Sequence, residues 1–158
     1  MDTHTLRNNK SGFALVVAVA ITGTLLLITT GLVNLAVKQA LISASARDSQ
    51  MAFYAADSAM ECALFWDVSA PSGATSFATT TTADINCNYT PSNPSNHWTV
   101  GGASVSTINT ITFNPDSYCA KLVVTKNANN TTLVQAYGYN TCDTLNPRRV
   151  ERAVQATY

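Results

Sequence analysis

A run of 25 residues without a charged side chain, residues 13–37, constrains this chain more than any other feature. As an α-helix this run is about 37 Å long at roughly 1.5 Å per residue, which exceeds the roughly 30 Å of a bilayer's hydrocarbon core. Arg7 and Lys10 precede the run and favour a cytoplasmic amino terminus, because positive residues near a membrane helix stay on that side. The sequence therefore predicts a helix over residues 13–37 that spans a membrane, with the rest of the chain exported.

The helical pattern does not stop at the end of this run. Residues 38–66 contain no Gly or Pro and are rich in Ala, Leu, Met and Gln, which are good helix formers. Apolar residues recur here at multiples of about 3.5, which indicates one apolar stripe along a helix. The members of that stripe are Ile42, Ala46, Phe53, Met60 and Leu64. We therefore expect one long helix over 13–66, with an amphipathic half over 38–66 on which a domain can dock.

The remaining residues, 67–158, are rich in Ser, Thr and Asn and have the character of a small β domain. Residues 67–97 contain four prolines or glycines and predict a long loop with a short strand near Cys87. The Asn-rich stretch 127–130 suits a hairpin turn, and short connections imply an antiparallel meander. The strands are predicted from Val, Ile, Thr and Tyr content at 105–113, 118–126, 131–140 and 149–158. The predicted fold is α+β: a long N-terminal helix packed against a small antiparallel sheet.

Four cysteines, all beyond the apolar run, predict disulfides in an exported domain. They are Cys62, Cys87, Cys119 and Cys142. No two of them form a CxxC pair, and zinc needs three or four close Cys or His ligands, so no metal site is predicted. The predicted strands place Cys119 and Cys142 at one end of a hairpin, which leaves Cys62 to pair with Cys87. Four cysteines allow three pairings, and free thiols are the alternative.

The charges and motifs argue against catalysis and nucleic-acid binding. Nine basic and nine acidic residues balance, and no basic stripe gathers them. The only histidines are His4 and His97, and neither lies in a nucleophile, phosphate-loop or dinucleotide motif. Arg148, Arg149 and Arg152 form one local basic cluster, which we interpret as protection of a terminal strand edge. The sequence predicts a protein that is not an enzyme and has no cofactor.

Three interpretations of the amino-terminal segment remain open. A secretory signal would be cleaved at Ala44-Ser45-Ala46, although its apolar core is normally only about 7–15 residues. A plain signal anchor would keep residues 1–12. The third interpretation rests on residues 10–16, KSGFALV, which stand at the cytoplasmic edge of the apolar run.

Residues 10–16 resemble the type IV prepilin signal. The resemblance implies a leader over 1–12, removed by a prepilin peptidase between Gly12 and Phe13, and N-methylation of Phe13. It further implies residence in the inner (cytoplasmic) membrane before assembly. Afterwards the protein would belong to an extracellular filament on the cell surface, joined to other pilin subunits through the N-terminal helix.

Val17 departs from the pattern of major pilins, which carry a glutamate at the fifth position after the cut. Val17 cannot make the polar contact that the glutamate is thought to make, because a carboxylate inside hydrocarbon needs a partner. The departure favours a resemblance to minor pilins and to the large pseudopilin of type II secretion.

A second resemblance lies in residues 52–59, AFYAADSA, which are similar to the segment that follows the membrane helix in PilX-like minor pilins. Asp57 falls where that family has an acidic residue. The physical interpretation of the same pattern is an alanine-rich helix packed closely on a sheet. The expected function is a structural, minor subunit of a type IV pilus or related filament. The alternatives are a membrane-anchored extracytoplasmic binding domain and a major pilin without the glutamate.

Overall fold

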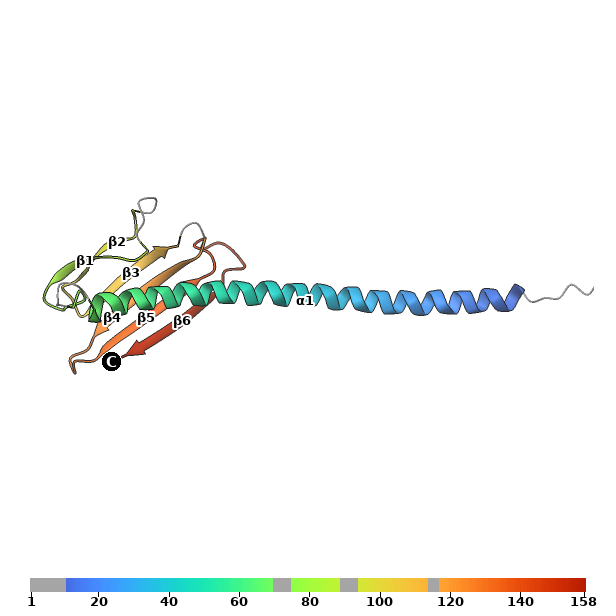
Figure 1. Ribbon diagram of the computed structural model, residues 1–158, viewed down its shortest axis with the longest axis horizontal. Helices are drawn as coiled ribbons and strands as arrows, with labels where there is room; N and C mark the ends of the chain where they lie inside the picture. Colours follow the sequence, from blue (N-terminus) through green and yellow to red (C-terminus); the bar gives the residue numbers. More distant parts are fainter. Residues whose placement is uncertain (1–10, 70–74, 89–93, 114–116) are drawn as a thin grey trace, which may run out of the picture. The chain divides into compact units, whose positions relative to one another are not determined.

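The computed structural model describes residues 11–69, 75–88, 94–113 and 117–158. It divides into two units, residues 1–44 and 45–158, which we describe separately. In the first unit the described residues form a single helix. The second unit holds the end of that helix and two antiparallel sheets (Figure 1). The fold is α+β, as predicted.

The long helix, α1, spans Ser11–Val68. Its predicted bounds, 13–66, are confirmed to within two residues at each end. The absence of Gly and Pro from residues 38–66 allows the main-chain hydrogen bonds to continue without a break. The helix ends where Ser69 N donates to Phe65 O at 2.9 Å, shortly before Pro71, which could not continue it.

The larger sheet is a four-stranded antiparallel meander in the order β3-β4-β5-β6. Its strands are Val105–Thr112, Cys119–Lys126, Thr132–Tyr139 and Glu151–Thr157. All four predicted strands are therefore confirmed. The β4–β5 turn closes with hydrogen bonds from Asn127 N to Thr131 O and from Asn130 N to Asn127 O. Asn130 has φ +63°, a left-handed conformation that asparagine tolerates.

The segment predicted as a long loop contains a second hairpin. Strands β1 (Thr82–Asn86) and β2 (His97–Gly101) pair in antiparallel register, with Ile85 opposite Trp98. The strand expected near Cys87 is present as β1, but the prediction missed β2. The reason is that β2 is short and its two apolar residues, Trp98 and Val100, follow prolines and precede two glycines.

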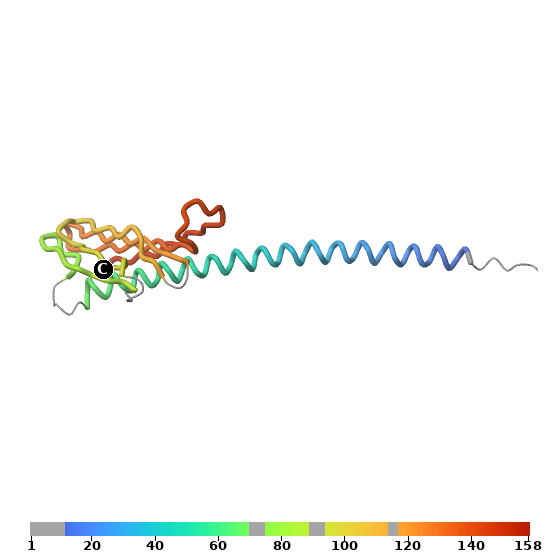
Figure 2. The backbone as a smooth tube through the Cα atoms, turned by 90° about the horizontal axis from the view of Figure 1, so that it is seen from above, coloured from blue at the N-terminus to red at the C-terminus, as the bar shows by residue number. Residues whose placement is uncertain are grey.

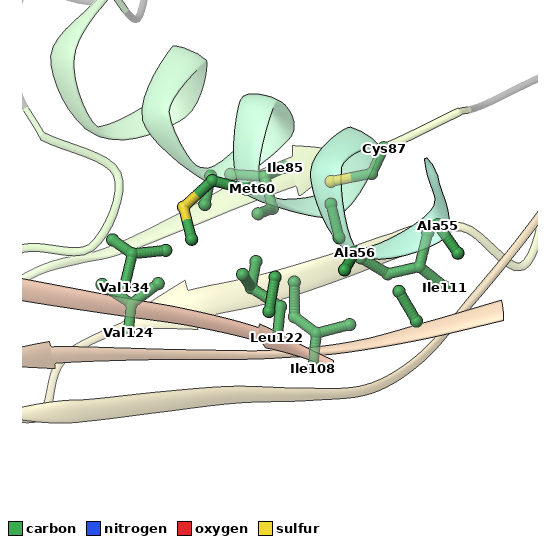
Figure 3. Packing of buried hydrophobic residues seen from close by; sticks show 14 of the residues in the cluster. Ala55, Ala56, Met60, Ile85, Cys87, Ile108, Ile111, Leu122, Val124 and Val134 are labelled. Atoms are coloured by element: carbon green, nitrogen blue, oxygen red, sulfur yellow. The ribbon is translucent and has the colours of Figure 1, made fainter. Parts of the chain in front are cut away.

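Alanines form the helix face that packs against the sheets. Leu122, Ile108 and Ile111 lie opposite them on the four-stranded sheet, with Val124 and Val134 below Met60 (Figure 3). Small helix residues let the two backbones approach, and the strands supply the apolar bulk of the core. The fully buried alanines of α1 are Ala52, Ala55, Ala56, Ala59 and Ala63.

The apolar stripe predicted for the helix is only partly the docking face. Met60 is buried and Leu64 packs against the core, but Phe53 is about half exposed and Ile42 is more exposed still. Large apolar side chains did not identify the docking face of the helix. Helix and sheet lie so close together that mainly alanines fit between their backbones. The interpretation of residues 52–59 as an alanine-rich helix packed on a sheet is confirmed.

Gly138 of β5 marks the closest approach of helix and sheet. A Cβ built there would overlap the carbonyl oxygen of Ala52 and the amide nitrogen of Ala56, and would lie 3.0 Å from Ala56 Cα. All three atoms belong to the helix backbone and cannot rotate away. Gly138 is therefore required by space rather than by a turn.

Candidate functional site

Gly12 and Phe13, the predicted cleavage junction, lie in the first turn of α1. The residues that precede the helix, 1–10, are outside the described part of the chain. A Cβ at Gly12 would meet no atom within 4 Å, and Phe13 is 78% exposed. The described residues therefore leave both positions uncovered.

The first half of α1 exposes its apolar side chains on every side. Its most apolar 18-residue window has a mean hydropathy of 2.3, and none of that window is buried. The helix is thus long and apolar enough to cross a membrane. Exposed apolar surface on this scale is unfavourable in water and indicates a lipid or protein environment. Among its large side chains, Phe13, Leu15, Val16, Leu26, Leu27, Leu32 and Val33 are all 60% exposed or more.

Four threonines interrupt this apolar surface, and each hydroxyl is satisfied within the helix. Thr22 Oγ1 donates to Ala18 O at 2.9 Å, and Thr24 Oγ1 donates to Ile21 O at 2.8 Å. Thr29 and Thr30 make the same kind of bond to carbonyls three or four residues earlier. Because each hydroxyl has a partner on its own helix, the threonines remain compatible with an apolar environment.

Val17 lies one turn into the same surface and is 38% exposed. Its side chain offers neither a charge nor a hydrogen bond. From Gly12 onward, the first acidic residue is Asp48, which lies in the second unit. The Val17 side chain can therefore contribute only apolar contact and shape to a surface that packs against it.

The Cys62–Cys87 disulfide joins α1 to the end of β1. This disulfide is the first of the two pairs suggested above. Its Cα atoms are 5.8 Å apart, and the two cysteines are separated by 25 positions in the sequence. Trp66, one turn further along the helix, donates from Nε1 to Asn86 O at 2.8 Å. A covalent bond and a hydrogen bond thus attach the β1–β2 hairpin to the last turns of α1.

Cys119 and Cys142 are free thiols, so the second suggested disulfide is not formed in this structure. The two side chains are neighbours that share a hydrogen bond. Burial, together with Cys142, raises the pKa of the Cys119 thiol to about 12. Adjacent strand ends predict that these two cysteines are neighbours, which they are, but neighbouring positions do not by themselves establish a covalent bond.

The arginine cluster next to β6 is partly engaged within the domain. The guanidinium of Arg149 stacks on the Tyr139 ring, 3.7 Å from its centroid, and Arg152 Nε donates to Ser49 Oγ at 2.8 Å. Figure 2 shows the segment between β5 and β6, dark red, standing out from the sheet. These contacts give two of the three arginines a structural role.

A buried carboxylate that was not predicted from the sequence, Asp67, connects the end of α1 to the end of β4 and to the residue that follows β6. The side chain of Asp67 is 2% exposed and accepts from Lys126 Nζ at 2.8 and 2.5 Å. Lys126 also donates to Thr132 Oγ1 at 2.9 Å, and the Tyr158 hydroxyl donates to Asp67 Oδ2 at 2.5 Å. We call Asp67, Lys126, Thr132 and Tyr158 the Asp67 network. It is compatible with a structural role, because each of its polar atoms is paired.

The Asp67 network predicts a loss of stability at alkaline pH. Burial, followed by the hydrogen bond and the negative charge of Asp67, raises the pKa of the Tyr158 hydroxyl above its ordinary value near 10. Above pH 10 the unfolded chain releases this proton while the folded state retains it, so stability falls as pH rises. We expect the stability advantage of the native chain over Tyr158→Phe to shrink between pH 9 and 11, measured by urea unfolding. An advantage that stays constant over this range would contradict the assignment.

The other ionisable residues do not converge on a reactive site. Among the described residues, no three His, Cys, Asp or Glu side chains are placed to hold a metal ion. His97 begins β2 and is exposed, Asp57 is half-buried, and Glu61 is exposed on the helix.

Comparison of this chain with protein-family models, with curated proteins and with solved structures finds no match.

Proposed function

We propose that this chain is a structural subunit of a type IV pilus or a related filament. It is cleaved between Gly12 and Phe13 and assembled through the first half of α1. The observation that carries the proposal is the exposed apolar surface that begins at the junction itself. Such a surface, continuous with a polar domain that contains a disulfide, is what a subunit needs if it is stored in a membrane and then packed into a helical bundle.

The proposed mechanism is the exchange of one apolar environment for another. The membrane holds the helix until a prepilin peptidase frees the amino group of Phe13, which is then N-methylated. Extraction into the filament replaces lipid contacts by contacts with the apolar helices of other subunits. The subunit moves from the inner membrane to an extracellular filament, with its polar domain exposed on the cell surface.

Val17 supports a minor rather than a repeating role. A glutamate at this place would need a partner inside the apolar bundle, and its pairing with a neighbouring amino terminus could set the register of each added subunit. A subunit with Val17 needs no polar partner from a neighbouring subunit at this position. It suits a position that is occupied once, such as a tip or an initiation complex.

Processing at the junction is tested by the mass and amino-terminal sequence of the mature protein in its native cell. We expect a chain that begins at N-methylated Phe13, and we expect Gly12→Leu to retain the leader in nearly all molecules. Gly23→Leu, in the same helix, is the matched control, because neither position has an atom within 4 Å of an added Cβ. The control should be processed normally.

Two other outcomes would reject the proposal. A native chain that keeps Met1 would identify a permanently anchored extracytoplasmic domain. A chain that begins at Arg47 would identify a secretory signal cleaved after Ala46.

A further inference from the structure

A polar hollow lies beside the β4–β5 turn, next to the carboxyl end of α1. Its volume is about 520 Å³, within the 300–1,000 Å³ typical of small-molecule sites. Residues 126–128 and 130–132 around the turn line it, together with Thr75, Thr79 and Ser104. A main-chain hydrogen bond from Lys126 N to Ser104 O, 2.7 Å long, joins two of these residues.

Most residues that line this hollow carry hydroxyl or amide groups, although carbon atoms supply about half of its surface. The side chains of Thr79, Ser104 and Asn130 are exposed and have no hydrogen-bond partner among the described residues. Each can both donate and accept. The hollow therefore presents several unused hydrogen-bonding groups within a space large enough for one or two sugar rings.

The charge of the hollow is neutral even though a lysine lines it. All three N–H groups of the Lys126 ammonium are used, two on the Asp67 carboxylate and one on Thr132 Oγ1. The Asp67 carboxylate balances its charge. An anionic ligand would have to break a buried ion pair, which is costly. A wholly apolar ligand would leave the polar half of the lining without hydrogen bonds, whereas a sugar offers both hydroxyl groups and C–H faces.

We propose that this hollow binds a neutral saccharide. A sugar presents hydroxyl groups that donate and accept in several directions, which matches the unused hydroxyl and amide groups of the lining. It carries no charge, which matches the balanced pair of Lys126 and Asp67. This site is separate from the helix surface used for assembly, so binding by the purified chain does not depend on the proposed function.

The test uses the full chain in zwitterionic detergent, because detergents with sugar headgroups would compete for the hollow. The purified protein is applied to an array of neutral, sialylated and sulfated glycans. Glucose, galactose, mannose and N-acetylglucosamine are also titrated in solution by NMR. We expect binding to at least one neutral sugar, with spectral changes confined to residues 126–132 and their neighbours Thr79 and Ser104.

The triple variant Thr79→Ala/Ser104→Ala/Asn130→Gly removes the unused groups, and glycine at 130 retains the positive φ. We expect affinity to fall at least tenfold. Thr107→Ala/Thr157→Ala, which removes exposed hydroxyls outside the hollow, should stay within twofold. The three single variants, each expected to bind more weakly, replace the triple variant if it does not fold. The proposal is overturned if no neutral sugar binds, if anionic glycans bind better, or if the variants bind as well as the native chain.

Discussion

Replacing Gly138 by alanine is expected to destabilise residues 45–158 by about 3 kcal/mol, at the upper end of the usual cost of overpacking a core. The added methyl group would overlap the backbone of α1 at Ala52 and Ala56. No side-chain rotation can relieve the overlap, so helix and sheet must separate. The fall in Tm should be roughly 10 °C for a domain of this size, measured by circular dichroism.

Gly31→Ala is the matched control for this substitution, because a Cβ at Gly31 meets no atom within 4 Å. It should leave the unfolding of the sheet domain unchanged. An unaltered Tm in Gly138→Ala would mean that the helix and sheet can move apart at little cost.

Replacing Lys126 by methionine is expected to cost about 3 kcal/mol, because it leaves the buried Asp67 carboxylate with the Tyr158 hydroxyl as its remaining side-chain partner. Asp67→Asn/Lys126→Met should recover more than half of that loss, since the double variant contains no unpaired buried charge. Both values come from chemical denaturation at pH 7.

Lys121→Met provides the control, because Lys121 is also half-buried on β4 and makes no ion pair with any described residue. It should change stability by less than about 0.5 kcal/mol. If the Lys121 and Lys126 variants behaved alike, the pair with Asp67 would contribute no more to stability than a half-buried lysine without an ion pair does.

The long helix and the four-stranded sheet could be predicted because their signals are local. Continuous apolar or helix-forming residues define α1, and β-branched residues between Asn-rich turns define β3 to β6. The alanine face was harder to predict as the docking surface. Alanines are needed there because Gly138, more than 70 residues further along the chain, lets the sheet come close to the helix. Sequence periodicity reports which residues share a face, but not how close the opposite layer comes.

The Asp67 network could not be predicted for the same reason. Asp67 stands 59 residues before Lys126 and 91 before Tyr158, and nothing in its local sequence distinguishes it from a solvated carboxylate. The polar hollow depends on the β2–β3 connection meeting the β4–β5 turn, which is a property of topology. The proposed junction at Gly12 and Phe13, by contrast, is a short local motif, and its cleavage stays a prediction.

The Cys62–Cys87 disulfide has a mechanical consequence. A pulling force that travels along α1 and reaches its last turns can pass directly into β1 through the sulfur atoms. The disulfide then bears the force in place of the 24 residues between the two cysteines. These residues cannot extend the chain if the end of the helix detaches from the sheet. Reduction of this bond would lower the force at which the domain yields and lengthen the extension that follows.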